Sequence, residues 1–140
     1  RRATTGTDGW VPADEATLNP VALHSVRTIM RSRFDSYIRL FMRETARQLE
    51  QIRVVVSTDG SAEDLVRAVH TLRSACSQIG AHRICGVAAF IEEHAIACAA
   101  GGNTVSDLLP QVDKLDALFA DVAAELERYA PPAQRQGDAS

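Results

Sequence analysis

Four long segments in which apolar residues recur every three or four positions constrain the fold of this chain more than any other feature. They cover about residues 33–56, 62–79, 81–99 and 106–129, and none shows the strict alternation typical of a half-buried strand. Amphipathic helices of this length bury their apolar stripes against one another, and the short breaks between them favour antiparallel neighbours. The sequence therefore predicts an all-α, antiparallel four-helix bundle.

Capping residues mark the starts of three helical segments, one of which is additional to the four above. Asn19 followed by Pro20 is typical of a helix start, so a short additional helix is expected over about residues 20–30, ahead of the bundle. Ser61 and Asp64 are spaced as in a capping box and open the segment 62–79. In the last segment Pro110 is tolerable within a first helical turn that is capped by Ser106.

The two ends of the chain differ in composition from the helical region. We expect residues 1–17 to be a linker and residues 131–140, which begin with two prolines, to be a flexible tail. A single domain then spans 18–130. Because the chain has no initiator methionine, we expect it to be a piece of a larger protein.

Composition excludes several classes of protein. The chain is 46% hydrophobic and 24% charged, a balance typical of globular proteins, and its net charge of −3 argues against nucleic acid as a partner. No apolar run is long enough for a bilayer, so no direct membrane contact is expected. Three cysteines without CxxC spacing indicate reduced thiols and a cytoplasmic location.

The segment 62–79 carries the residues best suited to chemistry. On a helical wheel its apolar stripe lies opposite His70 and comprises Leu65, Ala68, Val69, Leu72, Ala75, Cys76 and Ile79. The small neighbours Ser74 and Ser77 leave the imidazole unshielded, and Arg73 lies one turn away, where its guanidinium could reach an anion. An exposed imidazole can be an ordinary surface group, but neutral histidine is also a competent nucleophile near neutral pH.

The stretch from Ala68 to Ala81, AVHTLRSACSQIGA, resembles the phosphoacceptor motif of the histidine phosphotransfer (HPt) domains of bacterial phosphorelays. That motif reads His-x-Leu-Lys-Gly, then a small polar run, then an apolar residue, Gly and Ala. Further agreement comes from the neighbouring segments, at Phe41, Met42, Arg43 and Glu44 and at Ile84, Val87, Ala88, Ile91 and Glu92. The resemblance covers about residues 19–129 and suggests an origin in a hybrid sensor histidine kinase.

The resemblance implies a role for several residues. His70 would be the phosphoacceptor, Arg73 would take the place of the usual Lys, and Ser74 stands where the family usually has Gly. A receiver domain's aspartyl phosphate would phosphorylate His70, and a second receiver would take the phosphoryl group onward. The expected docking face comprises Val66, Arg67, Ser74, Ser77, Gln78 and Ala81.

The same resemblance implies how the domain works with its partners. Magnesium would be held by the receiver's carboxylates, while the domain itself would bind no metal or nucleotide and would catalyse little alone. We expect an isolated monomer that interacts with response-regulator receiver domains. Its expected place is the cytoplasm, including the cytoplasmic C-terminal part of a membrane-bound sensor kinase.

Three alternatives remain open from the sequence. One is the phosphoacceptor domain of a chemotaxis-type kinase, which has a similar motif, and another is an interaction module that works without phosphate. The dimerisation domain of a histidine kinase is disfavoured, because Thr71 follows His70 where that family usually has an acidic residue.

Two weaker patterns complete the candidates. Arg39, Arg43 and Arg47 form a ridge that is either a solvated face or a rim facing an acidic receiver. His94 and Cys98 are spaced for one turn of helix, but no second chelating pair accompanies them, so no zinc site is predicted.

Overall fold

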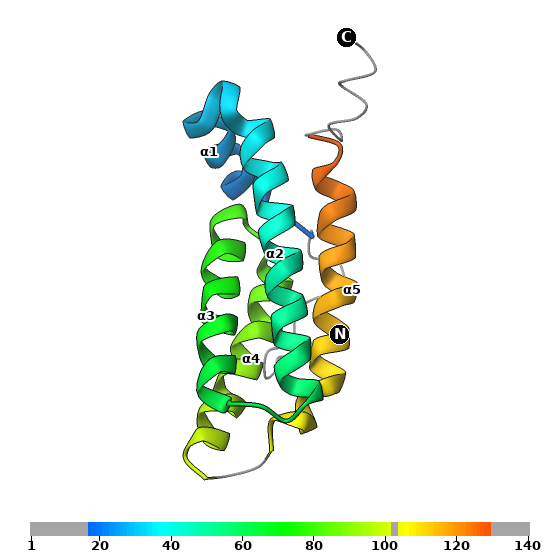
Figure 1. The fold of residues 1–140 in the computed structure, drawn as a ribbon. Helices are drawn as coiled ribbons and strands as arrows, with labels where there is room; N and C mark the ends of the chain where they lie inside the picture. Colours follow the sequence, from blue (N-terminus) through cyan, green and yellow to red (C-terminus); the bar gives the residue numbers. More distant parts are fainter. Residues whose placement is uncertain (1–16, 102–103, 130–140) are drawn as a thin grey trace, which may run out of the picture.

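The computed structural model describes residues 17–101 and 104–129, and within these ranges it contains helices and no strand. In chain order the elements are α1 (Pro20–Met30), the 3₁₀ turn η1 (Arg31–Arg33), α2 (Phe34–Ser57), α3 (Ala62–Ile79), α4 (His82–Ala99), the 3₁₀ turn η2 (Val105–Leu108) and α5 (Leu109–Leu126). Helices α2 to α5 run alternately up and down beside one another, and α1 lies at the end of the bundle where α2 begins (Figure 1). The predicted four-helix bundle with a short additional N-terminal helix is confirmed.

The structure describes little of the two segments that are predicted to flank the domain. The linker expected over residues 1–17 lies outside the described residues except for Thr17, and the tail over 131–140 lies outside them entirely. Helix α5 ends at Leu126 rather than near residue 129. No helix in the described ranges has the length and apolar character needed to cross a bilayer.

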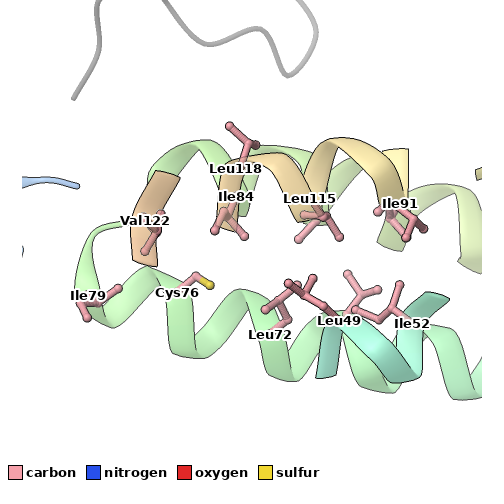
Figure 2. Packing of buried hydrophobic residues seen from close by; sticks show 14 of the residues in the cluster. Leu49, Ile52, Leu72, Cys76, Ile79, Ile84, Ile91, Leu115, Leu118 and Val122 are labelled. Atoms are coloured by element: carbon pink, nitrogen blue, oxygen red, sulfur yellow. The ribbon is translucent and has the colours of Figure 1, made fainter. Parts of the chain in front are cut away.

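The core is built from one buried stripe on each of the four bundle helices. Figure 2 shows side chains of α2, α3, α4 and α5 meeting there, among them Leu49, Ile52, Leu72, Cys76, Ile84, Ile91, Leu115 and Val122. On α5 the buried stripe includes Leu118, whereas the neighbouring Phe119 is only half-buried. Burial of these side chains is the main favourable term in the folding of the bundle.

The start of α5 differs from the prediction. Ser106 does not cap the helix; it lies inside η2, and its backbone N–H donates to Asp59 Oδ1 at 3.3 Å. Helix α5 then begins at Leu109 without a side-chain cap and has Pro110 in its first turn. A 3₁₀ turn that leads into a helix satisfies backbone groups that a capping side chain would otherwise have to satisfy.

Helix α1 is held against the turn between α3 and α4 by Asn19. The Asn19 backbone N–H donates to the Gly80 carbonyl at 2.9 Å, its Oδ1 accepts from the Val21 N–H at 2.8 Å, and its Nδ2 lies 3.1 Å from His82 Nε2. Arg27 extends the attachment to the start of α2 and to the turn after α5, because its guanidinium lies over the ring of Phe34 at 5.7 Å and over that of Tyr129 at 6.0 Å.

Gly80 is required both by its backbone conformation and by the close approach of α1. Its φ is +82°, in the left-handed region. A Cβ at this position would lie 2.8 Å from the Asn19 Cβ and 2.9 Å from the Ala22 Cβ. A residue with a Cβ therefore cannot fit there unless α1 shifts.

We expect Gly80→Ala to lower the free energy of unfolding by about 2–4 kcal/mol, from the left-handed strain together with the clash. Gly101→Ala is the matched control, because Gly101 also has a positive φ, +96°, but a Cβ there would meet nothing within 4 Å. Chemical denaturation of both variants measures the difference. If both variants lost the same free energy of unfolding, the contact of α1 with Gly80 would contribute nothing to stability.

A second prediction concerns pH. Burial, and to a lesser degree the neighbouring Cys85, raises the pKa of the Cys76 thiol from 9.0 to about 12. A folded-state pKa above the unfolded value stabilises the protein fully below about pH 9, and this stabilisation is lost as the pH rises from 9 toward 12. Denaturation on either side of pH 9 should therefore show a steeper alkaline loss of stability for the parent than for Cys76→Ala. If the stability of the two proteins fell in parallel as the pH rises, this prediction would be contradicted.

Candidate functional site

His70 lies in the middle of α3, on the side of the helix opposite its buried residues. Ser61 Oγ caps this helix by accepting from the Asp64 N–H at 3.1 Å, and Gly80 in the left-handed conformation ends it. The buried stripe of α3 comprises Leu65, Val69, Leu72, Cys76 and Ile79. Because these five residues fix the rotation of α3 about its axis, the imidazole of His70 faces outward, with 60% of its side chain exposed.

A carboxylate from the next helix joins His70 to Arg73. Glu92 Oε2 on α4 lies 3.4 Å from His70 Nδ1, and Glu92 Oε1 lies 2.8 Å from Arg73 Nη1. The Glu92 side chain is only 14% exposed, against 39% for Arg73, so the carboxylate is the fixed member of the group. Oε1 is buried and accepts no aligned hydrogen bond, which means that its contact with Arg73 is ionic.

This arrangement distinguishes the two nitrogens of the His70 ring. Nδ1 faces the Glu92 carboxylate, and a nearby carboxylate favours the tautomer that carries its proton on Nδ1. In that tautomer Nε2 keeps its lone pair on the side of the ring away from Glu92. The geometry therefore supplies an oriented imidazole with a cation one turn away.

Small side chains border the site along α3 and α4. Arg73, Ser74 and Ser77 line a shallow groove together with Cys85, Gly86 and Ala89 from α4. The Cys85 thiol donates to the Arg73 carbonyl at 3.7 Å, and burial raises the pKa of this thiol although Arg73 opposes the shift. Little side-chain bulk therefore stands between this side of the site and an approaching molecule.

The predicted docking residues fall into three groups. Arg67, Ser74, Ser77 and Gln78 are exposed, and Val66 is half-buried against the core. The prediction that Ala81 belongs to the docking face is wrong, because Ala81 is 0% exposed. It lies in the tight α3–α4 turn, where its N–H donates to the Cys76 carbonyl at 2.9 Å, so it offers no surface to a partner.

Sequence reasoning missed two contributions to the surface around His70. One is Glu92, whose relation to His70 depends on how α3 and α4 pack and has no signal in the spacing of either helix. The other is an exposed apolar area on α1 and α2 that includes Ile29, 75% exposed, and Leu40. Gln78 borders this area, because it lines two hollows whose other residues include Val26, Ile29, Met30, Tyr37, Leu40 and Phe41.

The weaker candidates do not join this site. Arg47 pairs with Glu44 at 2.7 Å, and both side chains are about half exposed, as expected for a solvated face. Arg43 is exposed and Arg39 is half-buried. Across residues 17–101 and 104–129, no three His, Cys, Asp or Glu side chains gather closely enough to hold a metal ion, and His94 and Cys98 are no exception.

Comparison with known proteins agrees with this geometry. The model of the Hpt domain family matches residues 36–139. Among solved structures, the histidine-containing phosphotransfer protein B (HptB) of Pseudomonas aeruginosa PAO1 is similar in fold, with a TM-score of 0.71 and 17% sequence identity over 84% of this chain and 96% of that one. No curated protein sequence matches the chain. With the family model covering most of its length, the chain belongs to the Hpt domain family and functions in histidine phosphotransfer within phosphorelay signalling.

Proposed function

We propose that His70 is the phosphoacceptor and that its Nε2 receives the phosphoryl group. The observation that carries this proposal is the carboxylate of Glu92 on the Nδ1 side of the ring, at 3.4 Å. It leaves Nε2, on the other side of a side chain that is 60% exposed, as the nucleophile. None of the other described histidines is at once exposed and oriented by a carboxylate within ion-pair distance while an arginine lies one turn away.

The transfer reaction requires little from this domain beyond position and charge. Nε2 would attack the phosphorus of an aspartyl phosphate, the N–P bond would form as the P–O bond to the aspartate breaks, and the aspartate carboxylate would leave. Arg73, one turn from His70, would supply the positive charge that stabilises the phosphoryl oxygens. Magnesium would be held by the receiver's carboxylates, and no metal site on this domain enters the mechanism.

We infer that response-regulator receiver domains dock over α3 and the exposed apolar area of α1 and α2. Ser74 and Gln78 connect His70 to that area along one face of α3, so that a single partner could cover both. Many protein interfaces combine polar contacts, which give specificity, with apolar contacts, which give affinity. A polar phosphoryl site beside an apolar area has this composition. The isolated domain is proposed to be a cytoplasmic monomer whose docking face stays open.

His70→Gln should abolish labelling by a phosphorylated receiver domain. The label on the parent protein should survive base and be lost in acid, as expected for an N–P bond, whereas an aspartyl phosphate is lost in base. His24→Gln, which replaces another exposed histidine far along the chain, is the control and should label normally. Undiminished label on His70→Gln would refute the assignment, and absence of label on the parent with every receiver tested would favour an interaction module.

Bulk at position 74 should block transfer without unfolding the domain. Ser74 is exposed and lies one turn from His70, and surface changes usually alter stability by less than about 0.5 kcal/mol. In the complex, Ser74→Trp would hold the donor away from Nε2, and a displacement of about 1 Å can slow a reaction roughly 100-fold. Ser74→Gly should transfer at the parent rate or faster. Melting curves and transfer time courses test both variants, and a Trp variant that melts and transfers normally would place docking elsewhere.

A further inference from the structure

Phosphorylation of His70 would change the charge of its ring as well as add a phosphoryl group. In the tautomer that Glu92 favours, Nδ1 carries the proton and Nε2 forms the N–P bond, so the phosphorylated ring is a cation. In the structure Nδ1 lies 3.4 Å from Glu92 Oε2. Resting on the proposed function of His70, we propose that Glu92 holds this proton on the phosphorylated ring and thereby keeps His70 an active phosphoryl donor toward higher pH.

The proton on Nδ1 decides in which form the ring leaves the phosphoryl group. When His70 receives the phosphoryl group, the P–O bond of the aspartyl phosphate breaks, the N–P bond at Nε2 forms, and Nδ1 keeps its proton. In the onward transfer the N–P bond breaks, its electron pair returns to Nε2, and the ring leaves as neutral imidazole. If Nδ1 had first lost its proton to solvent, the same step would release an imidazolate anion, which is a far poorer leaving group.

Glu92 is placed to retain that proton. An opposite charge within about 4–6 Å favours the charged form of a titratable group. The Glu92 side chain is 14% exposed and its Oε1 lies 2.8 Å from Arg73 Nη1, so the carboxylate stays beside the ring and is less screened than a surface carboxylate. The His70 side chain is 60% exposed, which keeps the expected effect moderate.

The cations near His70 act in the opposite direction. Arg67 and Arg73 lie one turn before and after it on α3, and each already has a carboxylate partner, Asp64 for Arg67 and Glu92 for Arg73. Helix α1 contacts α3 only toward its C-terminal end, beside Gly80. The other charged side chains beside this part of α3, from α2 and α4, are Glu44, which pairs with Arg47, and the exposed Glu93.

Transfer from the phosphorylated domain to an excess of unphosphorylated receiver tests the proposal. The parent and Glu92→Gln are phosphorylated on His70 with phosphoramidate, freed of the donor and mixed with receiver between about pH 6 and pH 9. The amide keeps nearly the same shape and an oxygen that can accept from Nδ1, but it lacks the charge that retains the proton. Titration of the receiver affects both proteins alike. The ratio of the parent rate to the variant rate should therefore grow about three- to tenfold from the lowest pH to the highest.

Glu93→Gln is the matched control, because the neighbouring Glu93 is exposed and its loss changes the net charge equally. Its ratio to the parent should not vary with pH. A ratio for Glu92→Gln that is the same at every pH would leave Glu92 with a structural role alone and overturn the proposal. An equal pH-dependent change in Glu93→Gln would also overturn it, because the effect would then come from net charge.

The ring can also be observed without a receiver. With ¹⁵N-labelled histidine, the chemical shift of Nδ1 in the phosphorylated domain reports the proton, and the midpoint of its titration should lie about half to one pH unit lower in Glu92→Gln than in the parent. Coincident midpoints would contradict the role of Glu92.

If Glu92→Gln does not fold, the phosphorylated parent is compared with the same phosphorylated chain unfolded in urea, where α4 no longer faces α3. The folded midpoint should be the higher one, and an equal or lower midpoint would overturn the proposal. Failure of every receiver to label His70 would end the proposed function but would leave these midpoints measurable, so the two failures are distinguishable.

Discussion

The antiparallel packing of α3 against α4 is the contact on which the rest of the site depends. Buried residues on both helices fix their rotation and their offset along the bundle axis, with Leu72 and Cys76 on α3 and Ile84 and Ile91 on α4 (Figure 2). That registration places Glu92 beside His70 and Arg73, whose side chains all point out of the core. Because close-packed interiors resist small shifts, the positions of these polar groups follow from apolar contacts below them.

The turn that joins these helices also positions the second part of the surface. Gly80 ends α3 in the left-handed conformation, and its carbonyl accepts from Asn19, so α1 rests on the turn. Ile29 on α1 and Leu40 on α2 are thereby held near the C-terminal end of α3, within reach of the surface that Gln78 lines. One glycine thus links the end of α3, the helix that carries His70, to the apolar area.

The sequence predicted the fold well because the relevant signals are local. Apolar periodicity, the Asn19 and Ser61 caps and the glycine at the end of α3 lie within single helices, and the structure has helices over those ranges. The same kind of reasoning placed His70 on the outward face of α3. The prediction that Ala81 belongs to the docking face, which came from the resemblance, is wrong, because a residue just after a helix end can lie buried inside a tight turn.

Glu92 shows the limit of sequence reasoning for the site. Glu92 is separated from His70 in the sequence by a turn and most of a helix. Its position on a helical wheel shows only that it borders the buried stripe of α4. The distance of 3.4 Å to His70 Nδ1 comes from the offset between two helices, and that offset depends on how side chains of unequal size interlock. A site assembled across a helix interface becomes visible only when both helices are placed.

The pairing with Glu92 also gives a physical reason why an arginine suits position 73. A lysine ammonium is a compact charge that interacts best with one anion at a time, whereas a guanidinium presents several N–H groups in a plane and can contact two acceptors. Arg73 Nη1 lies close to Glu92 Oε1, and the other N–H groups of the guanidinium remain for oxygens on its exposed side. Arg73 can therefore keep its contact with Glu92 while it presents N–H groups to the phosphoryl group that we propose His70 receives. An arginine at this position fits a site that already contains a carboxylate beside the proposed phosphoacceptor.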